Sequence, residues 1–489
     1  MMSLVPRGQD SVLAFVGLSM IAVFVLPTLA TYKALSLREE LSRHLFIAVP
    51  TILRYLFFTL SDCFFIAMVG HYDSTPVSHF AGVNMGVMLV NVTGLSLSIG
   101  FAGAMGPFVA QEYGTGYVKR SGLHLMNFAK CATLIFIFSF FSTLQSKEVL
   151  TRLGQDPEVA TCVQRYARIA VWALPGQMAM KGLQQVLDAQ RDVGPGLMAD
   201  AAGAVIQISL SWYALSSGAG FEGAAHVKVC SSSLVCCLLV AWIKLTGRGS
   251  RVWSSPANEP PADLSPFLRQ AVPNTFATVV EWWAQELMAL LAGLLPNPSM
   301  MVGANGVLFT CASIFYMVWV GSKNAMATRV GNLIGSGQPD KVPQAIAVGI
   351  VVCAVEVIAV VSLGTRYQSE IIALFTTNAE LQHAVAQSWC IMLFVLVPYS
   401  FTFVIFGVLS GAGRQGIVAY VFLVSLTVGM PVGICLSFGA KLGLDGLWLG
   451  NGAFFAIAGA ILYIKLFQSD WHSMKTLEDY VQIDEVLGA

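Results

Sequence analysis

The sequence is a series of long apolar blocks separated by short polar segments. Clear examples cover residues 81–110, 348–364 and 451–467. A helix needs about 20 mostly apolar residues to cross the hydrocarbon core of a bilayer. The strands of a membrane β-barrel would instead give shorter segments of alternating polarity. The pattern therefore predicts an all-α polytopic membrane protein.

The block lengths predict twelve core transmembrane helices. Their expected spans are 44–70, 80–112, 122–146, 158–186, 196–218, 222–246, 264–294, 300–334, 341–364, 380–410, 415–438 and 444–467. The long polar segment at 245–268 is rich in Pro and Ser and carries several charges. It divides the chain into two halves of six helices.

The two halves repeat each other in sequence. Three matches share one constant offset, which we call the repeat offset: 48–50 with 271–273, Pro175 with Pro398, and 220–223 with 443–446. A fourth match, 113–116 with 334–337, has nearly the same offset. Since each half has an even number of helices, both insert in the same orientation. The sequence thus predicts two parallel-repeat lobes related by a pseudo-twofold axis along the membrane normal.

The polar segments define the expected domains and their orientation. Lys and Arg gather at the ends of the helices on one side, which the positive-inside rule makes cytoplasmic. The expected parts are an N-terminal segment (1–43), an N-terminal lobe (44–246), a cytoplasmic linker (247–263), a C-terminal lobe (264–468) and a cytoplasmic tail (469–489).

Residues 11–30 form a further apolar stretch before the core. A cleaved signal peptide would export Lys33, Arg38 and Arg43, against the charge distribution of the other loops. We therefore favour an extra N-terminal helix, with a processed targeting segment as the alternative.

Composition narrows the functional class. Hydrophobic residues make up 56% of the chain and charged residues 11%, whereas soluble domains carry about 25% charged residues. This excludes an ordinary cytosolic enzyme and a disordered chain. The 27 basic and 27 acidic residues balance, so nothing indicates a nucleic-acid partner.

The usual enzyme and cofactor motifs are missing from the sequence. We find no P-loop, nucleophile elbow, HExxH motif or dinucleotide fingerprint. The ten cysteines lie mostly in apolar blocks, with no Cys/His spacing typical of zinc. We therefore predict no enzymatic activity, no cofactor and no metal, and a secondary transporter rather than an ATP-driven pump.

Two acids lie in the middle third of the apolar helix at 264–294. An intramembrane carboxylate costs about 3 kcal/mol on insertion scales and is functional by default; a protonated, hydrogen-bonded core group is the structural alternative. The five-residue spacing of Glu281 and Glu286 separates them by about 140°, so Glu281 is assigned to the cavity first. Gln285 shares its face, and Trp282 offers either a ring for a cation or simple packing.

Two segments carry specific motifs, EWWAQELMALLAGLLPNP at 281–298 and ATRVGNLIGSGQPDK at 327–341. They resemble the seventh helix and the segment after the eighth helix of the multidrug and toxic compound extrusion (MATE) transporters, eukaryotic branch. Supporting matches lie at 91–105, 111–116, 187–195 and 407–415. The resemblance covers about residues 40–468. It implies two lobes around a cleft and export of organic, often cationic, compounds in exchange for H⁺ or Na⁺.

The resemblance also bears on single polar residues. Asp62 lies about two residues away from the coupling Asp of prokaryotic members, which turns it by about 200°, so a site role and a structural role both stay open. Asn91 matches a second-helix Asn, for which an inward contact and interhelical packing are equally good interpretations. Tyr316 in the eighth helix is added to the expected cavity.

Three positions depart from the family pattern. Many plant members carry Asp where this chain has Phe403, so a second acid of the C-terminal lobe would be Glu286 or Glu356, unless one acid suffices. For Glu356 a local ion pair or an interhelical hydrogen bond is the simpler interpretation. Lys323 occupies a position that is usually small and polar, where it would snorkel, pair with an acid or alter the charge preference for substrates.

Prolines inside predicted helices indicate bends, because each removes a backbone hydrogen bond. These are Pro50, Pro175, Pro273 and Pro398. Bends that flex would serve alternating access, and static kinks would only shape the lobes.

We predict a monomeric secondary antiporter in the plasma membrane or an organelle or vacuolar membrane. Its partners would be a small organic substrate, H⁺ or Na⁺, and the lipid bilayer. The alternative is a flippase for lipid-linked oligosaccharides without ion coupling, although such a protein would more typically line its cleft with Arg and Lys.

Overall fold

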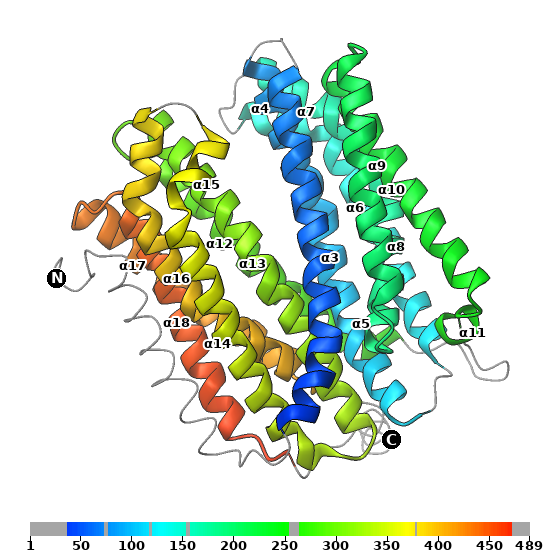
Figure 1. Ribbon diagram of the computed structural model, residues 1–489. Coiled ribbons are helices and arrows are strands. Elements are labelled where there is room, and N and C mark those ends of the chain that lie inside the picture. Colours follow the sequence, from blue (N-terminus) through cyan, green and yellow to red (C-terminus); the bar gives the residue numbers. More distant parts are fainter. Residues whose placement is uncertain are drawn as a thin grey trace. The chain divides into compact units, whose positions relative to one another are not determined.

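The computed structural model describes residues 37–72, 77–116, 120–152, 157–253, 264–376 and 379–471. These residues are almost entirely helical, and no strand occurs among them (Figure 1). The extra helix predicted at 11–30, most of the linker and the C-terminal tail lie outside the described residues.

The helices divide into those before and those after the linker. The first set is α3 (Leu37–Tyr72), α4 (Val77–Val90), η2 (Asn91–Leu95), α5 (Ser96–Gly114), α6 (Ser121–Arg152), α7 (Pro157–Ala170), η3 (Val171–Ala173), α8 (Leu174–Ala189), α9 (Gly194–Ser216), α10 (Gly220–Leu245) and α11 (Gly249–Val252). The second set is α12 (Leu264–Ala292), α13 (Pro298–Gly335), η4 (Pro339–Lys341), α14 (Val342–Arg366), α15 (Gln368–Phe375), α16 (Ala379–Gly411), α17 (Gln415–Ile434), η5 (Cys435–Gly439) and α18 (Leu444–Phe467).

The twelve predicted transmembrane helices are confirmed within the described residues. Two of them consist of consecutive elements, α4–η2–α5 and α7–η3–α8, in which a π or 3₁₀ segment joins two α-helical parts. Most ends agree with the prediction to within a few residues, but α3 begins at Leu37 and α6 runs on to Arg152. The short helices α11 and α15 were not predicted, because each is too short to leave a periodic pattern.

In the described part of the chain, nine helices are long and apolar enough to cross a membrane on composition alone. The long helices α7–α8, α9 and α12 fall below that level of hydropathy. They carry the buried acids Asp188, Asp200 and Glu281, respectively. These acids contribute to the lower hydropathy of the three helices.

The chain divides into two compact units. The C-terminal unit contains the described residues up to Ile52 and from Val280 onward, and the N-terminal unit contains Leu53–Val279. Both borders fall inside a continuous helix, one in α3 and one in α12. Each of these helices therefore contributes to both units. The lobe borders expected from the sequence, at 44–246 and 264–468, stay a prediction.

Within the C-terminal unit, α16 is the central helix: 83% of its most apolar window is buried. It packs closely on α13 through glycines at Gly407 and Gly411. A Cβ atom at these positions would lie 2.2 Å from the Lys323 carbonyl oxygen and 2.4 Å from that of Ala327. Small residues four apart let membrane helices approach in this way. The close contact fixes Lys323 of α13 against α16.

The sequence repeat also appears in the backbone. Gly220, the first residue of α10, and Gly443, which precedes α18, are separated by the repeat offset and have φ angles of 60° and 58°. Gly116 and Gly337, which follow α5 and α13, have φ angles of 78° and 67°. Only glycine adopts such left-handed angles without strain. The two halves thus begin and end equivalent helices with the same backbone conformation.

Candidate functional site

Glu281 is the best-defined candidate site residue in the C-terminal unit. It lies on α12, is 5% exposed and accepts two hydrogen bonds from tyrosine hydroxyls. The Tyr316 hydroxyl of α13 donates at 2.6 Å and the Tyr399 hydroxyl of α16 at 3.2 Å. Three helices thus converge on one carboxyl group. The structure brings the predicted residues Glu281 and Tyr316 together, whereas Tyr399 was not predicted.

Aromatic rings form the wall behind the Glu281 carboxyl group. Tyr399 stacks on Phe403 with ring centroids 4.7 Å apart, and Tyr316 meets Tyr399 edge-on at 4.9 Å. Phe455 of α18 contacts the Tyr399 ring at 4.2 Å. Phe403 and Phe455 are fully buried. We call Tyr316, Tyr399, Phe403 and Phe455 the aromatic cluster; it leaves the carboxyl group in a largely apolar environment.

Lys323 lies on the same cluster. Its ammonium is 4.3 Å from the Phe406 ring centroid and 5.4 Å from that of Phe403. Such cation–π contacts contribute roughly 0.5–2 kcal/mol each. No ion pair within 4 Å involves Lys323 among the described residues. Of the three roles open for Lys323, direct pairing with an acid is thus not seen.

Glu356 lies on α14, which packs against α13. Its carboxyl group and the Ser322 hydroxyl are 2.6 Å apart. This is the interhelical hydrogen bond considered for Glu356 in the sequence. Because Ser322 precedes Lys323, the contact also holds the part of α13 that carries the lysine.

The other predicted site residues of α12 are less well defined. Trp282 and Gln285 are partly exposed, and Trp283 next to them is 59% exposed. The side chain of Glu286 lies outside the described residues. Pro273 lies inside α12, Pro50 inside α3 and Pro398 inside α16, whereas Pro175 follows the 3₁₀ segment η3 at the start of α8.

Asp62 belongs to the N-terminal unit and has a cationic partner. It forms an ion pair with Lys228 of α10, and the Gln207 side-chain amide of α9 donates to it at 3.0 Å. Asn91, the other predicted residue of this unit, begins the π-helical segment η2. Lys228 was not predicted, although a cation in an apolar block is as strong a signal as an acid.

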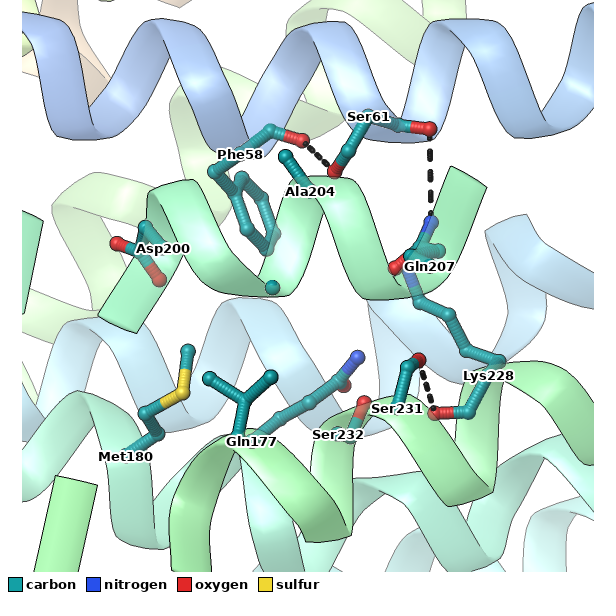
Figure 2. Close-up of a pocket in the computed structure, with 12 residues that line it drawn as sticks. Phe58, Ser61, Gln177, Met180, Asp200, Ala204, Gln207, Lys228, Ser231 and Ser232 are labelled. Atoms are coloured by element: carbon teal, nitrogen blue, oxygen red, sulfur yellow. Dashed lines mark hydrogen bonds between the residues drawn. The ribbon is translucent and has the colours of Figure 1, made fainter. Parts of the chain in front are cut away.

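A cavity of about 40 Å³ lies beside this ion pair in the N-terminal unit. That volume would hold about three water molecules. Figure 2 shows side chains from α3, α8, α9 and α10 around it, with the Phe58 ring directed inward. The lining residues include Phe58, Ser61, Gln177, Met180, Asp200, Gln207, Lys228 and Ser232.

A second charged cluster is buried next to the cavity. The Arg54 guanidinium is 2.5 Å from a carboxylate oxygen of Asp188 and 3.8 Å from one of Asp200. The Gln184 amide donates to Asp200 at 3.0 Å. The Lys181 ammonium lies 4.3 Å from the centroid of the Phe58 ring. Charges of both signs thus neutralise each other inside this unit.

Comparison with known proteins gives the family. A family model described as MatE matches residues 50–213 and 273–435, one match in each half of the chain. The chain belongs to the MatE family. The starts of the two matches are separated by the repeat offset, so the family model recognises the same duplication. Members of this family are transporters, and the apolar helices make the chain a multi-pass integral membrane protein.

Curated MatE relatives come from plants and animals. Protein DETOXIFICATION 16 of Arabidopsis thaliana is 28% identical over 85% of this chain and 85% of its own length. Multidrug and toxin extrusion protein 1 of Danio rerio is 27% identical over 89% of this chain and 73% of its own. The crystal structure of the eukaryotic MATE transporter AtDTX14 matches with a TM-score of 0.84 and 25% identity, covering 90% of this chain and 98% of that one. These matches confirm the all-helical transporter fold.

Proposed function

We propose that the protein is a monomeric secondary antiporter that exports small organic compounds in exchange for H⁺, with Glu281 as the coupling residue. Substrate would bind from the cytoplasmic side. Protonation of Glu281 from the opposite side would then weaken binding and release the substrate. A ligand shifts a conformational equilibrium only through different affinities for the two states, and the charge of Glu281 supplies that difference.

The observation that supports this proposal is the isolation of the Glu281 carboxyl group. It is buried, accepts hydrogen bonds from Tyr316 and Tyr399, and is in contact with no cation among the described residues. An ionised group in such surroundings is costly, so binding a proton or a cation is favourable. A carboxylate already paired with Arg or Lys would gain much less from binding a proton or a substrate cation.

The hydroxyl donors favour H⁺ over Na⁺ as the coupling ion. A hard metal cation needs several oxygen ligands arranged around it. Here both tyrosine hydroxyls donate their hydrogens to the carboxyl group, and aromatic rings pack against the two tyrosines. A proton requires only the carboxyl oxygen itself, so we propose proton coupling.

The proline-containing helices support alternating access. The border between the two units lies two residues after Pro50 in α3 and six residues after Pro273 in α12. A proline leaves one backbone hydrogen bond unmade and makes a helix easier to bend. We propose that α3 and α12 flex near these borders during transport. Roles of Glu286, Trp282, Gln285, Asn91 and Asp62 in coupling or in the substrate cavity stay proposals.

The test is transport in proteoliposomes with an imposed pH gradient. Tetraethylammonium uptake should be driven by the gradient in the wild type and lost in Glu281→Gln, which cannot change its protonation state. Glu281→Asp should keep part of the activity with an altered pH profile. Substrate binding to the wild type should strengthen as pH rises, because the carboxyl group loses its proton, and binding to Glu281→Gln should not change with pH.

Two controls make this experiment decisive. A Na⁺ gradient at constant pH should drive no uptake. Tyr316→Phe and Tyr399→Phe should alter the pH profile without abolishing transport, since the carboxyl group survives. Full gradient-driven transport by Glu281→Gln would show that another acid couples transport.

A further inference from the structure

The aromatic cluster of the C-terminal unit carries two opposite charges that are not paired with each other. The Glu281 carboxyl group is bound by the hydroxyls of Tyr316 and Tyr399. The Lys323 ammonium lies over the rings of Phe403 and Phe406. Between them is the stacked pair of Tyr399 and Phe403 rings. The site therefore has an acidic end, a basic end and an aromatic surface that connects them.

Each charge keeps an unused capacity to bind a partner. The ammonium has three N–H donors, and its contacts in the structure are ring faces, which accept no strong hydrogen bond. The carboxyl group receives hydroxyl donors but is in contact with no cation among the described residues. Both Lys323 and Tyr316 are partly exposed. The accessible side chains at the two ends are thus Lys323 itself and Tyr316, whose hydroxyl donates to the buried Glu281.

The position of the basic end is set by helix packing. The Gly407 backbone leaves room for the Lys323 carbonyl oxygen only because glycine has no Cβ. The adjacent Ser322 hydroxyl also contacts Glu356 of α14. The segment around Lys323 is therefore held by both α16 and α14. Helix packing therefore limits how far the Lys323 ammonium can move relative to the Glu281 carboxyl group.

We propose that this site selects zwitterionic aromatic compounds over permanent cations: the cationic group of the substrate binds Glu281, its carboxylate binds Lys323, and its ring system lies against Tyr316, the partly exposed ring of the aromatic cluster. The proposal rests on the function proposed above and names the substrate class for the same site. A compound with only a positive charge would meet repulsion from Lys323 and would leave that ammonium without an anion. Charge-assisted contacts at both ends distinguish the two classes.

This arrangement agrees with exchange for a proton. When Glu281 is protonated, the cationic group of the substrate loses its partner, while Lys323 continues to hold the carboxylate. Binding then weakens, and the substrate leaves. A purely anionic substrate would behave in the opposite way, because protonation of Glu281 would leave Lys323 as the dominant charge.

The test uses rhodamine 110, a zwitterion at neutral pH, and rhodamine 123, its cationic methyl ester. Binding of each dye to the purified protein in detergent is measured by fluorescence anisotropy, without any gradient. We expect the wild type to bind rhodamine 110 about tenfold more tightly than the ester. Lys323→Met and Lys323→Gln should remove this preference and strengthen binding of the ester, and Lys323→Arg should retain it. Lys465→Met, at an exposed lysine at the end of α18, is the matched control and should bind like the wild type.

Three results would overturn the zwitterion proposal: equal or tighter binding of the ester by the wild type, no measurable binding of either dye, or an unchanged preference in both uncharged Lys323 variants. None of these results bears on proton coupling, which the pH-gradient experiment on Glu281 tests separately. Two uncharged variants are used so that one that fails to fold does not decide the outcome. The wild-type comparison of the two dyes needs no variant at all.

Discussion

The two units carry different chemistry at positions that the repeat makes equivalent. At the repeat offset, Glu281, Phe403 and Phe455 correspond to Phe58, Met180 and Ser232, and all three of these line the cavity of the N-terminal unit. Tyr399 corresponds to Gly176. The C-terminal repeat therefore has an acid and packed aromatic rings at these positions. The N-terminal repeat has a phenyl ring, a thioether and a hydroxyl there, and they line a cavity.

The charges differ in the same way. In the N-terminal unit, Asp62 pairs with Lys228 and Asp188 pairs with Arg54. The counterparts of Lys181, Asp188 and Asp200 at the repeat offset are uncharged; they are Val404, Gly411 and Leu423. The C-terminal unit keeps Glu281 without a contacting cation among the described residues. The C-terminal unit also has a buried ion pair, Arg329 with Glu40 at 2.6 Å, but its Glu281 stands apart from that pair and remains available to a proton or a ligand.

The largest effect is expected on the stability of the N-terminal unit when its buried ion pairs are broken. Arg54→Met leaves Asp188 and Asp200 buried without their guanidinium partner. Breaking a buried ion pair from one side costs about 3–5 kcal/mol, so the variant should melt far below the wild type or fail to accumulate. Thermal melting monitored by size-exclusion chromatography measures this.

The control for Arg54 is an ion pair at the surface. Arg165 and Glu222 are 2.7 Å apart, with side chains 55% and 40% exposed. Pairs of this kind contribute about 0–1 kcal/mol, so Arg165→Met should melt close to the wild type. Equal melting of the Arg54 and Arg165 variants would show that the buried cluster is not a structural element.

A smaller effect is expected in the packing of the C-terminal unit. Gly407→Ala places a methyl group against the Lys323 carbonyl oxygen, which must move. Overpacking of this kind costs about 1–3 kcal/mol, and displacement of α13 should also reduce the preference for rhodamine 110. Gly416→Ala, where a Cβ meets nothing within 4 Å, should leave melting and dye preference unchanged. If the two variants behave alike, close helix contact does not position Lys323.

Breaking the Asp62–Lys228 ion pair beside the cavity should have a moderate effect on stability. Asp62→Asn leaves the Lys228 ammonium partly buried without an anion, which we expect to cost about 1–2 kcal/mol. Adding Lys228→Met should recover part of the loss, because no unpaired charge then remains. Gradient-driven transport by the double variant should persist if coupling resides in the C-terminal unit. Loss of coupling in a well-folded double variant would assign Asp62 a direct role.

The sequence alone predicted the helices and their repeat, because both depend on local patterns. Apolar blocks of sufficient length become helices wherever they lie, and their ends follow Gly and polar residues. Glu281 could also be singled out, since an acid in an apolar block has few structural explanations. The face argument directed Glu281 inward, and the structure buries its side chain.

The partners of the site residues could not be predicted in the same way. Tyr399 and Phe403 reach Glu281 and Lys323 from another helix, and their register depends on how α16 packs on α13. That packing is set by Gly407 and by side chains far apart in the sequence. Likewise, Lys228 and Asp62 are 166 positions apart, so no short motif connects them. Contacts between helices are a tertiary property that a single sequence leaves open.

Glu281→Gln should have the smallest effect on stability and the largest effect on transport. Glu281→Gln keeps an oxygen that can accept the hydroxyls of Tyr316 and Tyr399, and it leaves no cation without a partner. The free energy of unfolding should therefore change by less than about 1 kcal/mol, while proton-driven transport is lost. The same melting assay applies, at a pH high enough to ionise carboxyl groups at the surface. If Glu281→Gln destabilised the protein as much as Arg54→Met, the carboxyl group would be a structural element. The distinction between the paired buried charges and the available acid Glu281 would then fail, because Glu281 too would serve folding.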